Sequence, residues 1–331
     1  MLLTVVTYHY VRPIAGSRFP GLKGLDLVRF RHQLAHLCHA YTPVSLADVI
    51  AALTHVSTLP PNAVLLTFDD AYADHYRHVF PLLADRQIPA VFYPVASAVL
   101  ERRLLDVNKV HFVLACEPDL NRLVTLLEAA IDDARTEFNL SPLASYRQAH
   151  WRASPYDPAE AIYVKRMLQH ALPAALRARI TGELFRRYVT ADERTFADDL
   201  YFSLDQLRLM VQSGMSVGGH GYDHFWMNRL SNDEQECEID RSLAFLARLG
   251  VDGTQFTYAY PYGAYDRHTL AALAARGCRA AFTTEARVAD LGSENPLALP
   301  RLRTNDLPSD DTAGAHLPAG TAKDLTRWTS F

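Results

Sequence analysis

Two adjacent carboxylates, Asp69 and Asp70, follow a mostly apolar run and are the residues that first suggest chemistry in this sequence. The run, 63–68, has the length and composition of a buried strand, which would end at the acids. In parallel α/β folds, ligands bind at the carboxyl ends of strands. Neighbouring carboxylates repel each other unless a cation or a shared proton compensates. We therefore expect a cationic partner elsewhere in the chain.

Two histidines four residues apart, His220 and His224, offer such a partner. They follow a predicted strand, 215–219, that ends in two glycines, which permit close backbone approach. Two imidazoles and one carboxylate leave coordination positions open on zinc, as in catalytic sites. His32 and His36 have the same spacing, but they lie opposite the apolar face of their predicted helix, so we interpret them as solvated.

The acid pair also has a structural interpretation, in which one acid caps the next helix and the other is solvated. The downstream histidines weigh against it. With a metal present, one carboxylate would ligate the ion, and the other would stay free as a general base that activates water.

A third segment, 258–263, ends a predicted strand in a sharp turn between Pro261 and Gly263. A backbone N–H in this turn could point at a developing oxyanion. The alternative is an ordinary strand-ending turn with aromatic packing.

Outside residues 101–200, helices that end at glycine alternate with short apolar strands. This rhythm favours a parallel α/β fold closed as a barrel. Capping signals begin helices at Ser45, Ser203 and Ser231. The predicted strands are 2–7, 41–44, 63–68, 88–94, 215–219, 255–260, 278–284 and 297–302.

Residues of about 101–200 carry helical periodicity and few strand signals, so we expect a helical insertion within one barrel domain of residues 1–304. A polar tail, 305–331, would follow. The role of the insertion stays open between a lid, a subunit interface and a wall for the substrate.

The bulk composition excludes several classes of protein. A net charge of −4 gives no electrostatic case for nucleic acid or an anionic membrane surface. The four cysteines make no Cys-x-x-Cys pair and are interpreted as buried thiols. The sequence has no recognisable signal peptide and no stretch that could cross a bilayer, so the expected location is cytoplasmic.

Three segments together resemble the motifs of the polysaccharide deacetylase family, also called the NodB-homology or carbohydrate esterase family 4 group. They are Thr67-Phe68-Asp69-Asp70, His220-x-x-x-His224 and Tyr260-Pro261-Tyr262-Gly263, in this order. The resemblance covers about residues 1–100 and 200–303, outside the insertion. It implies a distorted (β/α) barrel of the NodB type, a divalent metal, and hydrolysis of an N-acetyl group on an amino sugar.

The resemblance also implies roles for individual residues. Asp69 would be the catalytic base, and the backbone N–H of Tyr262 would help to hold the oxyanion. His9 would line the pocket. The implied metal ligands are Asp70, His220 and His224, and the implied substrate-binding residues are Tyr260, Pro261 and Tyr262.

The chain departs from the family pattern at two motif positions. Ala71 stands where members usually have glycine, and Ala259 stands where many have an arginine that orients the base. On the last strand, Arg301 or Arg303 could replace that arginine, and Arg301 is the first choice.

The late motif that supplies the general acid is not evident in this chain. His9 and His316 are weak candidates, so the acid is unassigned.

The implied cofactor is most simply zinc, although nickel, cobalt or iron suit the same ligands. Expected substrates are an acetylated amino sugar, a sugar nucleotide, a lipid-linked glycan or a nascent surface polysaccharide such as lipopolysaccharide O-antigen. Alternatives are a deformylase, a hydrolase of another non-peptide amide, and a catalytically silent carbohydrate-binding protein. The oligomeric state stays open.

Overall fold

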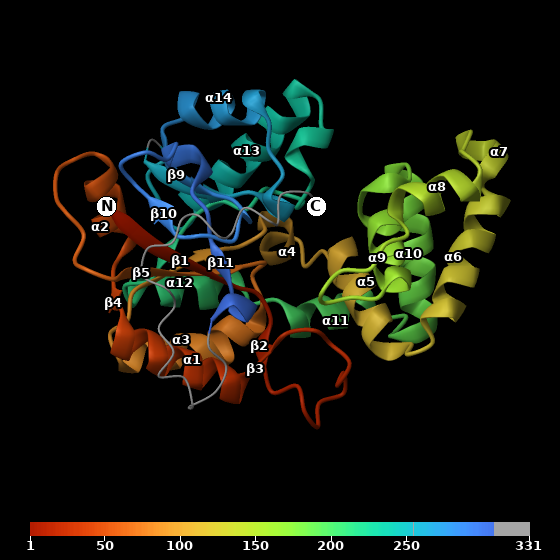
Figure 1. Ribbon diagram of the computed structural model, residues 1–331, viewed down its shortest axis with the longest axis horizontal. Coiled ribbons are helices and arrows are strands. Elements are labelled where there is room, and N and C mark those ends of the chain that lie inside the picture. Colours follow the sequence, from red (N-terminus) through yellow and green to blue (C-terminus); the bar gives the residue numbers. More distant parts are fainter. Residues whose placement is uncertain (254, 308–331) are drawn as a thin grey trace. The chain divides into compact units, whose positions relative to one another are not determined.

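The computed structural model describes residues 1–253 and 255–307 (Figure 1). The chain divides into two compact units. The first comprises residues 1–12, 25–101 and 200 onward, and the second comprises 13–24 and 102–199. Of the predicted polar tail, residues 308–331 lie outside the described residues.

The first unit is an α/β fold whose central strands pair in parallel: β1 with β5, β5 with β6, and β6 with β7. A strand at one edge, β10, pairs antiparallel with β1. The strands are β1 (Leu2–Tyr8), β2 (Val11–Arg12), β3 (Leu25–Asp26), β4 (Thr42–Pro43), β5 (Ala63–Asp69), β6 (Ala90–Tyr93), β7 (Ser216–Val217), β8 (Phe256–Ala259), β9 (Cys278–Phe282), β10 (Ala289–Asp290) and β11 (Leu302–Arg303).

The parallel pairings continue from β7 around to β1. A single bridge joins Gly219 to Tyr258, at β8, and β8 pairs with β9. A second bridge joins Phe282 to Leu299, and β11, three residues later, pairs with β1. This ring of parallel pairings is the arrangement that a distorted barrel requires. The strand predicted at 215–219 is shorter than expected, since only two residues form β7. The strand predicted at 297–302 is wrong for most of its length, because a 3-10 helix covers Pro296–Ala298 and β11 begins only at Leu302.

The helices of the first unit begin where the capping signals predicted. Ser45, Ser203 and Ser231 each form a capping box with the residue three positions later. After Asp70, a helix starts at residues 73–74, winds as a π-helix over His75–Val79 and continues into α3. The α-helices are α1 (Leu27–Ala40), α2 (Leu46–Leu53), α3 (Phe80–Asp85), α4 (Ala96–Leu100), α12 (Leu204–Gln212), α13 (Asn232–Ala247) and α14 (Arg267–Ala275).

Alternate side chains of β1 and β5 serve two different cores, because successive strand residues point to opposite faces. Val6, Leu66 and Phe68 belong to the cluster that also contains residues of α1 and α3. Val5 and Leu65 belong to a second cluster, shared with β6, β8 and β9. By the same alternation, the side chain of Asp69 lies on the same face of β5 as that of Leu65. The carboxylate is therefore on the interior side of the ring.

The second unit is helical. In Figure 1, α5 to α10 run from yellow to green. The last residue of α11 belongs to the first unit. The elements are α5 (Asp106–Cys116), α6 (Leu120–Asp133), α7 (Arg135–Phe138), α8 (Leu143–His150), α9 (Ala159–Arg166), a π-helix (Met167–Ala171), α10 (Ala174–Tyr188) and α11 (Glu193–Leu200).

Aromatic rings form part of the core of this helical unit. The Phe112 ring lies 4.9 Å from that of Phe19 and 4.8 Å from that of Phe196, and Phe185 contacts Phe196 at 5.1 Å. Phe19 lies in the segment predicted as a loop after the first strand. That segment, 13–24, therefore packs as part of the helical unit.

The interpretation of all four cysteines as buried holds only for Cys278, since Cys116 is partly exposed. Cys38 and Cys237 are exposed, because they lie on the outer faces of α1 and α13, whereas Cys278 is buried in β9. A search of the described residues finds no helix whose length and apolar character would let it span a membrane.

Removal of the Phe112 ring tests the aromatic core. We expect Phe112→Ala to lower the free energy of unfolding by about 3–5 kcal/mol, because it leaves a cavity at a fully buried position. Urea titration followed by far-UV circular dichroism measures this. The control is Tyr156→Ala in the same unit, which removes a ring that is 51% exposed and should change stability by about 0.5 kcal/mol or less. Equal effects of the two variants would contradict the assigned core.

Candidate active site

Three buried side chains converge where β5 and β7 end. Asp70 follows β5 directly, and His220 and His224 lie in the loop that follows β7. The Oδ1 atom of Asp70 lies 3.3 Å from Nε2 of His220 and 3.3 Å from Nε2 of His224. One ligand atom from each of the three residues lies within 4.8 Å of the others. The sequence predicted this grouping, although the residues are about 150 positions apart in the chain.

These atoms fit a divalent metal ion. In a tetrahedral zinc site each ligand atom lies about 2.0–2.1 Å from the ion, so two ligand atoms lie about 3.3 Å from each other. The Oδ1 atom of Asp70 is buried and has no hydrogen-bond partner among the described residues, so it is left available to a cation. Two imidazoles and a carboxylate hold three positions of such an ion and leave the others open, as in catalytic sites.

Neighbouring groups orient two of these side chains. The Nδ1 atom of His220 lies 2.7 Å from the carbonyl oxygen of Ala259, to which it donates, so Nε2 is the nitrogen that faces Asp70. The Tyr72 hydroxyl donates to Oδ2 of Asp70 at 2.9 Å. Burial raises the pKa of Tyr72 well above its ordinary value, so the hydroxyl stays protonated. Sequence reasoning missed Tyr72. The only feature of the sequence that points to this contact is the position of Tyr72, two residues after Asp70.

A second residue that sequence reasoning missed is Glu238 of α13. Its Oε2 atom accepts hydrogen bonds from the backbone N–H groups of Tyr222, at 2.9 Å, and Asp223, at 3.0 Å. Both groups belong to the loop between His220 and His224. Burial raises the pKa of Glu238. One carboxylate thus fixes the backbone that carries the two imidazoles. Nothing in the local sequence of a helix marks such a long-range contact.

The carboxylate of Asp69 is paired with Arg301 inside the ring of strands. The guanidinium makes two hydrogen bonds, at 2.9 Å to Oδ1 and 2.8 Å to Oδ2, and both side chains are 1% exposed. It also donates to Oγ1 of Thr67 and to the carbonyl oxygen of Thr283. Thr7 donates to Oδ2 of Asp69 at 3.3 Å. This is the arginine that the sequence favoured over Arg303, whose guanidinium contacts the Thr284 carbonyl oxygen.

The electrostatics keep both acids ionised. Burial alone would raise the pKa of Asp69, but Arg301, His220 and His9 hold it below its ordinary value. Burial likewise opposes ionisation of Asp70, and the two imidazoles hold its pKa well below the usual range.

The pKa values of the two imidazoles shift in opposite directions. Burial lowers the pKa of His220, but Asp70 and Asp69 outweigh it and the net shift is upward. For His224, burial prevails over Asp70, and the pKa is lowered. A lowered pKa favours the neutral imidazole, which is the form that binds a metal.

Tyr262 borders the cluster in a left-handed backbone conformation, with φ of 59°. Its ring stacks on Trp226, with centroids 4.6 Å apart, and tilts against His224, also at 4.6 Å. Left-handed φ values recur among the neighbours, at 73° for Asp70, 62° for Ala71 and 60° for His224. Such conformations cost energy in residues other than glycine and gather at functional sites.

The remaining predicted residues are placed less centrally. The imidazole of His9 is half exposed, and its Nε2 atom lies 3.9 Å from Oδ2 of Asp69. Tyr260 and Pro261 are buried, and the Tyr260 hydroxyl donates to the carbonyl oxygen of Leu297 at 2.7 Å. Tyr262 is the one of the three substrate-binding candidates with a partly exposed surface. His316 lies outside the described residues.

Comparison with known sequences gives the same class of protein. The family profile described as polysaccharide deacetylase matches residues 57–125 and 179–281, more than half of the chain. A poly-β-1,6-N-acetyl-D-glucosamine N-deacetylase of Escherichia coli is 41% identical over 96 residues, which are 28% of this chain and 14% of that protein. The chain is thus matched to only a small part of that relative.

Solved structures share the fold. A Streptococcus pyogenes deacetylase, PplD, in complex with acetate, has a TM-score of 0.54 at 18% identity, covering 92% of both chains. IcaB from Ammonifex degensii has a TM-score of 0.53 at 21% identity, covering 91% of both chains. At these identities the likeness extends to the fold alone. It agrees with the predicted α/β fold of the NodB type.

The homologues indicate a hydrolase that acts on carbon–nitrogen bonds other than peptide bonds, which is the predicted class of enzyme. The chain belongs to the polysaccharide deacetylase family.

Removal of one hydroxyl tests the outer contact to Asp70. We expect Tyr72→Phe to weaken binding of a divalent metal about 10- to 100-fold, because Asp70 loses the donor that orients it. Competitive titration with a chromophoric chelator measures the affinity. Tyr93→Phe is the matched control, since it also removes a buried hydroxyl, bonded to Thr257, but leaves the cluster intact. The same affinity in Tyr72→Phe and the parent protein would show that the contact does not orient the ligand.

Proposed function

We propose that the chain is a metal-dependent N-deacetylase that removes the acetyl group from an amino sugar of a polysaccharide. The observation that carries the proposal is the pair of adjacent acids at the end of β5, which have different partners. Asp69 is a buried, ionised carboxylate held by Arg301, and Asp70 beside it belongs to the metal-binding cluster. A protein that only binds carbohydrate has no use for a base next to a metal.

We infer that Asp70, His220 and His224 hold the ion. A divalent ion bound there would polarise the amide carbonyl and lower the pKa of a water molecule. Zinc suits two imidazoles and a carboxylate, and nickel, cobalt or iron suit them as well.

Asp69 would act as the general base. Its pKa lies below the ordinary value, so the carboxylate is ionised and ready to accept a proton from the attacking water. The paired hydrogen bonds from Arg301 fix the plane of the carboxylate. Arg301 therefore acts through Asp69 as a positioning residue.

Two further groups complete the proposed chemistry. The backbone N–H of Tyr262, in a turn held by the stack on Trp226, would donate to the oxyanion that forms at the amide carbon. His9 is our choice of general acid, which would protonate the departing amine. Its imidazole is half exposed and lies beside Asp69, so it is open both to solvent and to the base.

The relatives guide the choice of substrate. The Escherichia coli relative is a poly-β-1,6-N-acetyl-D-glucosamine N-deacetylase, so oligomers of β-1,6-linked N-acetylglucosamine are the first substrate to test. Acetylated sugar nucleotides and lipid-linked glycans of lipopolysaccharide biosynthesis follow. The cytoplasmic location stays a prediction.

Two substitutions separate the base from the ligands. We expect Asp69→Asn to retain about one divalent ion per chain and to lose acetate release, because the amide cannot accept the proton. Asp70→Asn and His220→Ala should lose the ion as well as activity. Elemental analysis of protein purified without an affinity tag gives the metal content. Acetate release from β-1,6-N-acetylglucosamine oligomers gives the activity.

Each outcome of this experiment has a distinct meaning. Acetate release that is unchanged in Asp69→Asn would remove the base assignment. A parent protein that binds no metal, even after zinc is added, would remove the metal-dependent mechanism. A parent protein that binds metal and glycan but releases no acetate would favour a silent carbohydrate-binding protein.

Replacement of the guanidinium tests the positioning role. We expect Arg301→Lys to lower kcat about 100-fold with little change in metal content, because lysine keeps the charge but lacks the fork that aligns Asp69. Arg303→Lys, two residues further along the chain and in contact with a backbone carbonyl, should keep kcat. Steady-state kinetics with parallel metal analysis distinguish the two. A loss of metal in Arg301→Lys would instead assign it a structural role.

A further inference from the structure

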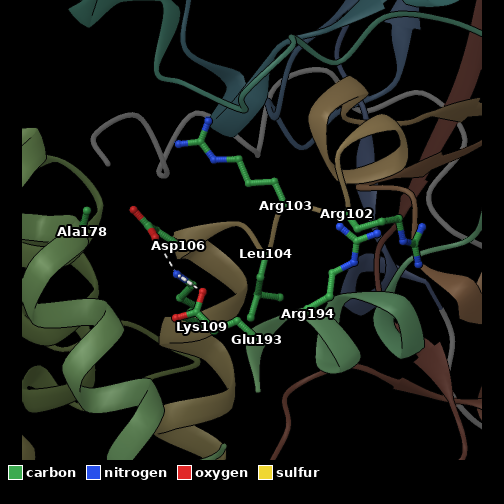
Figure 2. A pocket seen from close by; sticks show the side chains of 8 residues that line it. All are labelled: Arg102, Arg103, Leu104, Asp106, Lys109, Ala178, Glu193 and Arg194. Carbon is green, nitrogen blue, oxygen red and sulfur yellow. Dashed lines mark ion pairs between the residues drawn. The ribbon is translucent and has the colours of Figure 1, made fainter. Parts of the chain in front are cut away.

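The helical unit contains a cavity of about 340 Å³ (Figure 2). This volume is at the lower end of the range of small-molecule sites. The cavity lies among the turn before α5, the first turn of α5, the first turn of α11, and α10. Its charged lining consists of four cations and two acids: Arg102, Arg103, Lys109, Arg194, Asp106 and Glu193.

One cation bridges the two acids of the lining. The Nζ atom of Lys109 lies 2.7 Å from Oε2 of Glu193 and 3.6 Å from Oδ1 of Asp106. Lys109 is 9% exposed, so this chain of ion pairs is held in place by the surrounding helices. Figure 2 shows the three side chains in a row, with Arg103 extending beyond them over the cavity. Both acids thus face a lysine, and the three arginines of the lining outnumber them.

The turn that presents the arginines is firmly built. Arg102 has a left-handed backbone, with φ of 55°. Its guanidinium donates to Oδ1 of Asp198 at 2.7 Å and to the carbonyl oxygens of Ala197 and Asp198 at 3.0 Å. These three contacts tie the turn that carries Arg103 to α11. Arg194, which lies 3.5 Å from Asp198, completes the cationic side of the cavity.

A helix terminus adds to the positive potential. Asp106, the first residue of α5, lines the cavity, and the residue before it, Leu105, supplies no side-chain cap to the helix. The first N–H groups of an α-helix have no partners within the helix and carry the positive end of its dipole. Oxyanions bind at such termini. Arginines combined with a helix amino terminus are the chemistry that recognises phosphate groups.

We propose that this cavity binds a phosphate group of a ligand, between Arg103 and Arg194 and facing the first turn of α5. The site lies wholly within the helical unit and is separate from the residues assigned to deacetylation. Guanidinium groups bind phosphate through paired hydrogen bonds. The phosphate could belong to a phosphorylated sugar or be free inorganic phosphate, and these share the chemistry of the site.

Calorimetric titration of the full chain with glucose 1-phosphate, inorganic phosphate and glucuronate tests the proposal. We expect glucose 1-phosphate or inorganic phosphate to bind, with an affinity that falls as salt rises, and glucuronate to bind at least about 10-fold more weakly. Tighter binding of glucose 1-phosphate than of inorganic phosphate would identify a phosphorylated sugar as the ligand, and the reverse order would identify the free ion. Glucuronate binding as tightly as either, or no binding of either phosphate, would overturn the proposal.

Variants locate the binding. Arg103→Ala combined with Arg194→Ala should weaken phosphate binding at least about 10-fold, and Arg103→Lys alone should weaken it less. Arg122→Ala, an exposed arginine on α6, is the matched control and should leave binding unchanged. His220→Ala should also leave it unchanged, which separates this site from phosphate held by an ion at the metal cluster. Binding that is lost in His220→Ala but kept in the double variant would overturn the assignment to the helical unit. Thermal unfolding checks that each variant is folded.

Discussion

Burial of the Asp69 carboxylate inside a ring of strands demands a cation in the same interior, and Arg301 meets this demand. Both side chains are 1% exposed and share two hydrogen bonds. Loss of one partner from such a pair costs about 3–5 kcal/mol, because the other charge stays buried without compensation. Arg301 lies between Leu299, which bridges to β9, and β11, which pairs with β1. The residue that holds the base thus lies in the segment that closes the ring, so the fold and the readiness of the base depend on one another.

Asp70 meets the same demand in a different way. Its Oδ2 atom accepts from Tyr72, but its Oδ1 atom faces two imidazole nitrogens and has no hydrogen-bond partner among the described residues. In the neutral form of His220, the form that binds a metal, Nε2 is an acceptor, because Nδ1 donates to a carbonyl oxygen. An acceptor that faces a carboxylate is unfavourable unless a cation lies between them. Under the proposed function, the two adjacent acids would divide their work through their partners: an arginine would keep one ionised as the base, and the other would be left to a metal ion.

The sequence was sufficient for the residues that adjoin recognisable strand ends and insufficient for contacts made from a distance. Asp69, Asp70 and the two histidines follow apolar runs, so their meeting could be predicted from the rule that parallel strands end at one edge. Arg301 could be proposed because Ala259 stands where many members of the family have an arginine that orients the base. Tyr72 and Glu238 could not, since a tyrosine in a loop and a glutamate on a helix have no local feature that reveals a partner. The short strands were overestimated in length because apolar character continues beyond the paired residues.

The contacts that sequence reasoning missed lie beside strained backbone. Asp70, Ala71, His224 and Tyr262 all have left-handed φ values, which cost about 1–3 kcal/mol each in residues other than glycine. Such a conformation persists only where neighbours determine it more strongly than local preference opposes it. The hydrogen bond from Tyr72, the two backbone bonds to Glu238 and the stack of Trp226 on Tyr262 are these neighbours. The strain turns the side chains inward at the strand ends, and the outer contacts make that arrangement rigid, which is what a site for positioned water and a developing charge requires.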